Sequence, residues 1–278
     1  MTILQFVLEV MFFSVGSGVI GALTGLGGAA ILIPLLVVVF HVDIHYAMGA
    51  GLFAVMATSA GAAVAYLREG YINIRIGMFL ELAASVGALV GAYVTSFLPA
   101  QIVEGIFGAV FLVSAYLSYR RHESLDLPQT SHPLALRLKL DGTYPTKEGV
   151  VSYKVQNVWV AFNIMSLAGM LAGLLGIGSG SLKVVAMDQA MRLPYKVSTS
   201  TSNFIIGITA AVGSGVYFQQ GFINPLITLP VVVGVFFGAL LGARLMPKLP
   251  VKPLRALFSV IIVILALEMI YRALGGRI

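Results

Sequence analysis

The chain has 278 residues, of which 59% are hydrophobic and only 10% are charged, and its mean hydropathy is +0.97. Soluble domains carry about 25% charged residues, so this composition excludes a soluble globular protein and predicts an integral membrane protein. The net charge of +6 does not indicate nucleic-acid binding, because the basic residues lie in short loops beside apolar segments. The absence of cysteine excludes disulfides and thiolate metal sites, and no nucleotide-binding loop or other cofactor motif is present.

The chain divides into apolar segments long enough to cross a membrane. The first carries Glu9 and lacks a basic head, so we interpret it as a retained helix and not as a signal peptide. Two shorter apolar segments, 29–40 and 181–191, each follow a glycine-rich break. The predicted spans are 3–24, 47–67, 76–97, 102–119, 157–175, 198–218, 226–246 and 254–271.

The two sets of segments superimpose without a gap at an offset of 151 residues. The offset pairs Gly25 with Gly176 and Gly27 with Gly178. It also aligns GALVGAY at 87–93 with GALLGAR at 238–244 and GYIN at 70–73 with GFIN at 221–224. We therefore predict an internal repeat, with a first membrane repeat at 1–120, a polar linker at 121–153 and a second membrane repeat at 154–278.

The basic residues predict that the two repeats have inverted topology. With inverted copies and a cytoplasmic linker, 14 lysines and arginines fall inside and two outside, and Lys183 within a segment completes the 17. Parallel copies give 10 inside and six outside. The positive-inside rule favours inversion, which places both termini outside the cell membrane. The fold class is then an all-α membrane protein with two inverted repeats, whose short segments are discontinuous helices that either cross or re-enter after the glycine breaks.

The linker contains two stretches that alternate apolar and polar residues, LRLKLDGTY and VVSYKVQNV. This alternation predicts a short cytoplasmic β-hairpin, and a disordered connector is the alternative.

The glycine breaks are the first candidate binding site. A helix that starts after a break exposes unpaired N–H groups and the positive end of its dipole, which suit an anion. Inverted-repeat transporters place such helix starts near the middle of the membrane. The alternative is that the small residues only allow close helix packing, which is also our interpretation of the GALxGA faces. The candidates are Gly27, Gly28, Gly178, Ser179, Gly180 and Ser181.

Polar residues after the second break extend this candidate site. Lys183 follows the break in an apolar setting, which indicates an anionic ligand or a partner carboxylate, with snorkelling to the interface as the alternative. The run Ser198 to Asn203 offers hydroxyl and amide donors for an oxyanion, and the alternative is helix capping and interhelical bonding. Its first-copy counterpart is apolar, so we expect the second copy to supply most polar contacts. The candidates are Lys183, Thr199, Thr201, Ser202 and Asn203.

Two acidic residues are candidates for coupling or gating. Glu81 lies within a predicted span without an obvious partner, as a proton carrier would, and interfacial placement is the alternative. Asp188 and Arg192 have the i,i+4 spacing of a helical ion pair, which leaves a gating role for Asp188 as the alternative. His41 and His45 flank Asp43 in a loop and do not predict a metal site.

The doubled motif resembles the TauE/SafE family of sulfite-exporter-like permeases. The resemblance rests on Gly25-Leu26-Gly27-Gly28-Ala29, on Gly176-Ile177-Gly178-Ser179-Gly180, on Thr201-Ser202-Asn203-Phe204 and on the GALxGA faces. It covers nearly the whole chain except the linker. It implies transport of a small sulfur-containing or organic anion such as sulfite or a sulfonate, with export the usual direction, along a path lined by the break glycines, Gly25 included, and by Thr201 to Asn203. Ser179 and Ser181 depart from the family's glycine run.

The sequence therefore predicts a secondary transporter that moves a small anion by alternating access, either coupled to a proton or ion gradient or without coupling. It predicts neither a cofactor nor catalysis, and it predicts lipid and the anion as partners. The alternatives are a passive anion channel or uniporter, and a membrane partner protein that does not transport.

Overall fold

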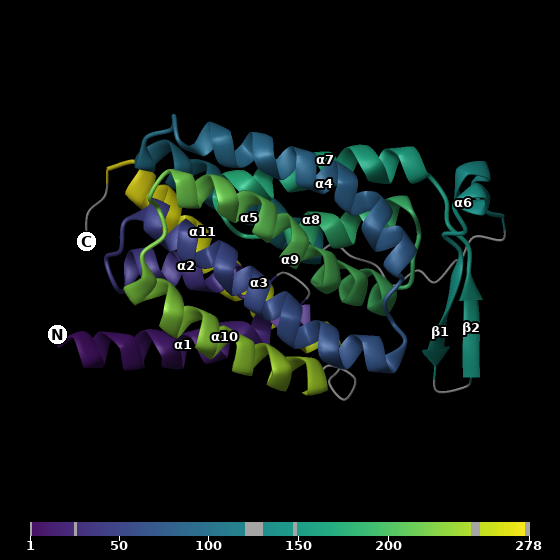
Figure 1. The fold of residues 1–278 in the computed structure, drawn as a ribbon, viewed down its shortest axis with the longest axis horizontal. Helices are drawn as coiled ribbons and strands as arrows, with labels where there is room; N and C mark the ends of the chain where they lie inside the picture. The colour runs from purple at the N-terminus through teal and green to yellow at the C-terminus, as the bar shows by residue number, and fades with distance from the viewer. Residues whose placement is uncertain (1, 25–26, 120–129, 147–148, 246–250, 276–278) are drawn as a thin grey trace.

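The computed structural model describes residues 2–24, 27–119, 130–146, 149–245 and 251–275, and the protein is mostly helical (Figure 1). The helices before the linker are α1 (Ile3–Thr24), α2 (Ala29–Val38), α3 (Ile44–Glu69), α4 (Ile74–Thr95) and α5 (Ala100–Tyr119). Those after it are α7 (Val158–Leu175), α8 (Gly180–Val185), the π-helix η1 (Ala186–Ala190), α9 (Tyr195–Gln219), α10 (Pro225–Leu245) and α11 (Val251–Ala273).

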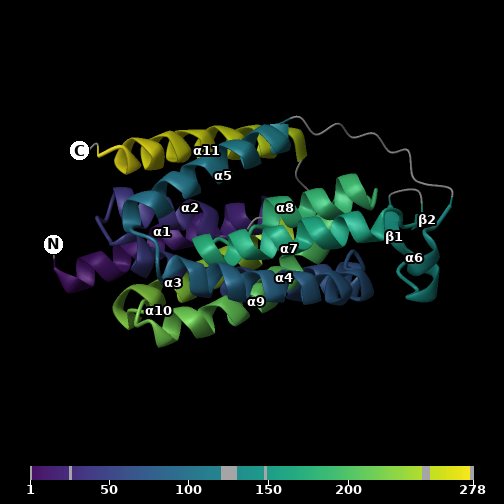
Figure 2. The same ribbon diagram turned by 90° about the horizontal axis from the view of Figure 1, so that it is seen from above.

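Within the described residues, six helices are long and apolar enough to cross a membrane: α1, α3, α4, α7, α9 and α10. We predicted eight such spans, and the other two, 102–119 and 254–271, fall on α5 and α11, which both include residues whose side chains lie outside the described set. In the described part of α5, Ala100–Val113 is a shorter apolar helix. Figure 2 shows α5 and α11 lying side by side as a layer along one side of the other helices.

Glycines bring α1 against α10 and α4 against α7. An added methyl carbon on Gly238 would overlap the carbonyl of Val15, and one on Gly87 would overlap the carbonyl of Ser166. These two contacts are equivalent: at the 151-residue offset, Gly87 corresponds to Gly238 and Val15 to Ser166, so each contact joins a glycine of one copy to a carbonyl of the other. The small residues of the GALxGA faces thus allow backbones to touch, as small-residue motifs do in membranes.

Two pairs of equivalent helices run antiparallel where they touch. In α3 and α9, Ser59 Oγ donates to the Phe204 carbonyl at 3.0 Å, while Leu52 lies beside Gly213. In α5 and α11, Gly105 lies beside Ala273, and Gly108 lies beside Ala266. In each pair, residue numbers rise along one helix as they fall along the other.

The loops between these helices also make equivalent contacts from one copy to the other. At the start of α3, the His45 ring stacks on Phe222 from the loop before α10, with centroids 4.9 Å apart. At the start of α9, Lys196 lies 5.5 Å over the Tyr71 ring from the loop before α4. Offset by 151 residues, His45 corresponds to Lys196 and Tyr71 to Phe222. A side chain at each helix start therefore rests on an aromatic ring of the other copy.

The linker forms a small cap at one end of the helices, opposite the start of α1 and the end of α11 (Figures 1 and 2). It contains α6 (Pro133–Arg137) and the antiparallel strands β1 (Gly142–Thr146) and β2 (Gly149–Tyr153). Our expectation of strand from Leu136 was wrong, because Pro133 opens a helical turn there, and the His132 ring caps it by accepting from Leu134 N at 3.2 Å.

Asn73, just before α4, holds this cap to the membrane helices. Its amide donates to the Leu140 carbonyl at 2.9 Å and to the Tyr153 hydroxyl at 2.8 Å. Burial raises the pKa of Tyr153, an effect that the bond from Asn73 partly opposes, so the phenol stays neutral and keeps accepting this bond.

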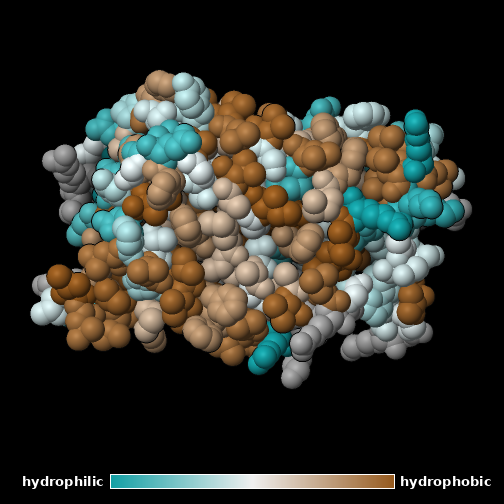
Figure 3. All heavy atoms as spheres, viewed as in Figure 1, coloured by the Kyte–Doolittle hydropathy of each residue, from teal (hydrophilic) through white to brown (hydrophobic). Residues whose placement is uncertain are grey.

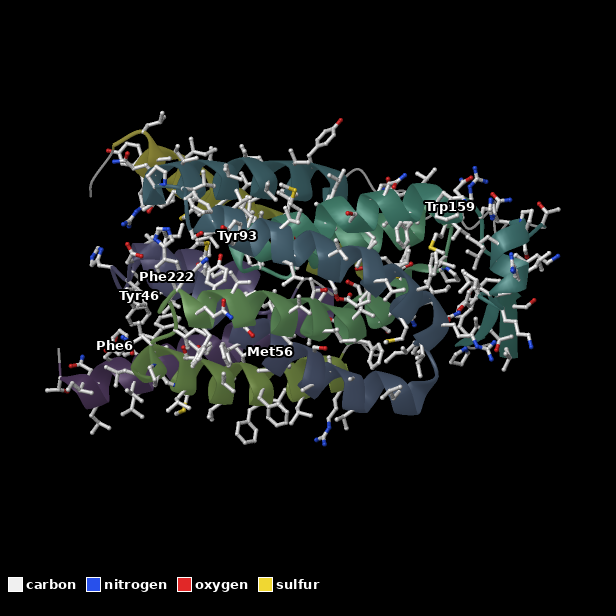
Figure 4. The ribbon with its side chains drawn as sticks, turned by 45° about the horizontal axis from the view of Figure 1, so that its top comes forward. Phe6, Tyr46, Met56, Tyr93, Trp159 and Phe222 are labelled. Atoms are coloured by element: carbon white, nitrogen blue, oxygen red, sulfur yellow. The ribbon has the colours of Figure 1, made fainter. Side chains whose placement is uncertain are left out.

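The surface fits a bilayer environment. Apolar residues cover much of the face in Figure 3, and hydrophilic residues gather toward its two ends. Figure 4 places Trp159 toward the linker end and Tyr46 and Phe222 toward the opposite end, with Met56 between them. Trp and Tyr concentrate at membrane–water interfaces.

Candidate functional site

The two glycine breaks lie together between α3 and α9. Gly27 and Gly28 are not helical and precede α2, which begins at Ala29, and α7 ends at Leu175 before α8 begins at Gly180, so both breaks interrupt the helices. Gly27 (φ +80°) and Gly178 (φ +72°) both lie against Val55 and Ile206. A methyl carbon on Gly27 would lie 3.3 Å from each of these side chains, and one on Gly178 would lie 2.9 Å from Val55. Val55 and Ile206 are themselves equivalent at the 151-residue offset.

The start of α9 contacts helix ends from both breaks. Ser202 Oγ donates to the Gly180 carbonyl at 3.4 Å, at the first residue of α8. Asn203 Nδ2 donates to the Ala22 carbonyl at 3.1 Å, near the end of α1. These bonds bring Ser202 and Asn203 together with the breaks.

Several oxygens in this region are buried without a partner. Ser198 to Asn203 have no exposed surface, and Ser179 is 3% exposed. A buried polar atom normally has a hydrogen-bond partner, because leaving it unpaired costs about 1–3 kcal/mol. The unpartnered atoms here are Ser179 Oγ, Ser198 Oγ, Thr199 Oγ1, Ser200 Oγ and Asn203 Oδ1. The four hydroxyls can each donate to a ligand, whereas the amide oxygen of Asn203 can only accept a hydrogen bond.

Ser179 also has a strained backbone. Its φ of +45° lies in the left-handed region, which favours glycine. The equivalent Gly28 has φ −63° and ψ −24°, so the two breaks differ in conformation. Strain of this kind persists where the surrounding structure holds it, and it concentrates at functional sites.

Thr201 does not lie with these residues. Its hydroxyl accepts from Asn73 N at 3.1 Å, and its methyl group lies beside Gly77 of α4. At 100° per residue, Thr201 lies on the side of α9 opposite Thr199 and Asn203. Of the other candidates, Gly25 lies outside the described residues, and Ser181 is in α8.

Lys183 and Glu81 form a buried ion pair. Lys183 Nζ lies 3.2 Å from Glu81 Oε2, and the two side chains are 0% and 3% exposed. Our interpretation of Glu81 as an acid without a partner was therefore wrong, because a lysine 102 residues away in the other copy reaches it. For Lys183, this is the partner carboxylate that its position indicated.

Thr209 of α9 completes this cluster. Its hydroxyl accepts from Lys183 Nζ and donates to Glu81 Oε1 at 2.5 Å. Ser85 Oγ donates to the same carboxylate oxygen at 3.0 Å. The sequence analysis missed Thr209, although the offset pairs it with Thr58, which donates to the Ala54 carbonyl and accepts from Gly28 N at 3.0 Å. Two threonines at one position of two apolar helices were the available signal.

The remaining candidates lie elsewhere. Asp188 lies in the π-helix, and Arg192 follows it with φ +58°. The α-helical i,i+4 geometry that we expected for them is therefore wrong. In the part of the chain that the structure describes, no group of three or more His, Asp or Glu could hold a metal ion.

The comparisons with known proteins agree with this architecture. The family model described as "Sulfite exporter TauE/SafE" matches residues 10–269. The chain belongs to the TauE/SafE family. Within it, the chain is 31% identical over 240 residues to the probable membrane transporter protein YdhB of Bacillus subtilis, covering 84% of this chain and 89% of YdhB.

More distant relatives align over nearly their whole length. The probable membrane transporter protein YunE of Bacillus subtilis is 28% identical over 265 residues, or 93% of this chain and 95% of YunE. The probable membrane transporter protein MJ0441 of Methanocaldococcus jannaschii is 21% identical over 268 residues, or 91% of each chain. No solved structure matches the chain significantly. The TauE/SafE match makes this chain a member of a membrane transporter family.

Proposed function

We propose that the protein is a secondary transporter that exports a small sulfur-containing or organic anion, such as sulfite or a sulfonate, by alternating access. One observation carries the proposal: four buried hydroxyls without partners, those of Ser179, Ser198, Thr199 and Ser200, lie at a glycine break and at the start of α9. The description of the TauE/SafE family supports the substrate class and the direction.

The chemistry of these side chains suits a small oxyanion. A serine or threonine hydroxyl donates one hydrogen bond and rotates to meet its acceptor. Ser198, Thr199, Ser200 and Ser179 can therefore each donate to an anion oxygen. The first copy has apolar residues at the equivalent positions: at the 151-residue offset, Met48 corresponds to Thr199 and Gly49 to Ser200. The anion would thus be held mainly by the second copy.

An inverted repeat with re-entrant or discontinuous short helices is part of the proposal. It is supported by the antiparallel contacts of α3 with α9 and of α5 with α11, and by the exchange-related contacts of α1 with α10 and α4 with α7. Transporters of this kind bind substrate between the repeats and move one repeat against the other. The distribution of lysine and arginine favours a cytoplasmic linker, with both termini outside a cell membrane.

Anion flux in proteoliposomes tests the site. Wild-type protein should give saturable flux of sulfite or a sulfonate, and Asn203→Ala and Thr199→Val should weaken half-saturation by about 10- to 150-fold, because a hydrogen bond to a charged group is worth about 1.5–3 kcal/mol. Ser214→Ala is the matched control, since Ser214 is a hydroxyl on α9 whose oxygen donates to the Ala211 carbonyl away from the site. Unchanged flux in both site variants would remove the proposed site.

A cysteine-labelling experiment separates alternating access from a passive channel. The chain has no cysteine, so Leu52→Cys, at the position equivalent to Asn203, introduces the only thiol. Alternating access predicts that an impermeant reagent reaches this thiol from each side of the membrane in turn, and that the anion slows labelling. Flux that does not saturate, with simultaneous labelling from both sides, would support a channel instead.

A further inference from the structure

The cluster of Lys183, Glu81 and Thr209 joins three separate elements inside the membrane region. Lys183 comes from α8, Glu81 from α4 and Thr209 from α9, and all three side chains are buried. Both oxygens of the Glu81 carboxylate are occupied, one by Lys183 and the other by Thr209 and Ser85. The pair is therefore charge-balanced and hydrogen-bonded as the protein stands.

The fold does not require this ion pair. The equivalent positions in the other copy are Leu32, which is fully buried, and Val232, which packs against the same hydrophobic core. The two copies have the same framework, yet only one contains charges. Replacing a buried ion pair by apolar residues is often neutral or stabilising, and an ionisable residue within the membrane indicates a functional role.

Lys183 is close enough to the breaks to serve two partners. Its backbone N–H donates to the Ser179 carbonyl at 3.2 Å, so it lies one helical turn from the second break. Thr209 lies two turns, or about 10 Å, along α9 from Ser202, on the same side of the helix. The lysine has a flexible four-carbon stem, and a change of rotamer alone could turn its ammonium from Glu81 toward the break.

Few other charges act on this cluster. Helix α7, which packs against α4 and α8, contains no ionisable residue, and α5, which also packs against α8, carries Glu104 and Tyr116. The other ionisable residues on the described parts of α4, η1 and α9 are five or more residues along the chain from Glu81, Lys183 or Thr209: Arg75, Tyr93, Asp188, Tyr195, Lys196 and Tyr217. Glu81 and Lys183 are thus each other's principal electrostatic partner.

We infer that Lys183 alternates between Glu81 and the transported anion, and that a proton on Glu81 makes the exchange possible. In the empty site, the carboxylate and the ammonium sum to zero charge. In the loaded site, a protonated Glu81, the ammonium of Lys183 and a monoanion also sum to zero. Because unbalanced charge is costly in a low-dielectric interior, one proton enters and leaves with each monoanion.

This inference rests on the proposed function and adds its coupling ion. One-to-one proton–anion symport is electroneutral, so at equilibrium each unit of pH difference balances a tenfold ratio of the anion. Export then requires an anion gradient steeper than the opposing proton gradient.

The test uses methanesulfonate, which remains a monoanion across the working pH range, in proteoliposomes with an internal pH dye. A vesicle interior one pH unit more alkaline than outside should give about tenfold accumulation by the wild type, with one proton per anion. Glu81→Gln, which imitates the protonated acid, should keep anion-for-anion exchange and lose both proton movement and accumulation. Lys183→Gln should lose anion exchange as well. Glu104→Gln, at a glutamate of α5 that lies 3.9 Å from Arg272, should behave as wild type.

The outcomes separate this inference from the proposed function. Saturable wild-type flux without protons, or full accumulation by Glu81→Gln, would overturn the inference alone. No saturable flux of methanesulfonate, sulfite or other sulfonates by the wild type would overturn both. Loss of exchange by folded Glu81→Gln would also overturn the inference; if size-exclusion chromatography shows that the variant does not fold, the proton-to-anion ratio of the wild type still decides.

Discussion

The buried ion pair predicts opposite pH dependence for two single substitutions. Lys183→Leu and Glu81→Val each copy the residue at the equivalent position of the other half, Leu32 or Val232. Each single change leaves one buried charge without its partner, and that group can remain in the fold by becoming neutral. Neutralising a free carboxyl group at pH 7 costs about 3.7 kcal/mol, and neutralising a free ammonium group costs about 4.6 kcal/mol. We expect losses in unfolding free energy close to these values.

The two losses should change with pH in opposite directions. In Lys183→Leu, the folded state holds one more proton than the unfolded state, so stability should rise by about 1.4 kcal/mol for each unit that the pH falls below 7, until the unfolded carboxyl also protonates. In Glu81→Val, the folded state holds one proton fewer, so stability should rise as the pH increases above 7. The double variant should be neutral or up to about 4 kcal/mol more stable than wild type, with Thr209 bonding to the Ile205 carbonyl, 3.4 Å away.

Unfolding in mixed detergent micelles, followed by the fluorescence of Trp159, the single tryptophan, measures these effects. Measurements at pH 5, 7 and 9 give the slopes, and the four variants form a double-mutant cycle. Parallel pH dependence in the two single variants, or a double variant no more stable than the weaker single one, would refute the assignment of a buried charged pair.

Three further substitutions test packing, backbone strain and the linker contact. Gly238→Ala should lower the unfolding free energy by about 1–3 kcal/mol, because the methyl group meets the backbone of α1, whereas Gly16→Ala, with nothing within 4 Å, should not destabilise, as melting in detergent would report. Ser179→Gly should raise the unfolding free energy by about 1 kcal/mol, because glycine relieves the left-handed strain. The same change should weaken anion binding, measured as half-saturation of flux. A variant that is more stable and binds the anion more tightly would exclude a binding role for the Ser179 hydroxyl. Asn73→Ala should lower the unfolding free energy by about 1–3 kcal/mol, because it removes the cap of α4 and two hydrogen bonds to the linker. Tyr153→Phe removes only one of these bonds and should lower it less. Equal losses in the two variants would mean that only the bond to Tyr153 matters.

Several helix positions followed closely from the sequence, and one helix start has a clear local cause. The predicted span 3–24 coincides with α1, and the span that we began at residue 47 begins at Ile44 because Asp43 caps it by accepting from His45 N. The linker was less accurate, since alternation at Leu136–Leu140 is compatible with a helical turn that Pro133 starts. Where a side chain caps a helix, as Asp43 and His132 do, local chemistry therefore defines the helix start better than hydropathy does.

The site was only partly accessible to sequence reasoning. The polar run of α9 was identified because six consecutive polar residues are costly in an apolar segment. Which side of the helix each of them occupies depends on neighbours far away in the chain, such as Asn73 for Thr201. The partnership of Glu81 with Lys183 could not be predicted from the repeat, because the equivalent residues, Val232 and Leu32, contain no charge that would indicate a pair.

The two halves differ in the polar groups that they bring to the proposed anion site. The contact of the two breaks with Val55 and Ile206 is nearly symmetric, whereas the hydroxyls, the amide of Asn203 and the ion-paired Lys183 all belong to the second half. An anion held by these groups would stay with α8 and α9 during a conformational change, because leaving them would expose its charge to apolar surroundings. The first half has apolar Leu32, Met48 and Leu52 at the positions equivalent to Lys183, Thr199 and Asn203, while Thr58 bonds to its own break and Glu81 pairs with Lys183. Under the proposed function, we therefore expect the second half to hold the anion throughout the cycle, and the Glu81 carboxylate of the first half to take back Lys183 when the site empties.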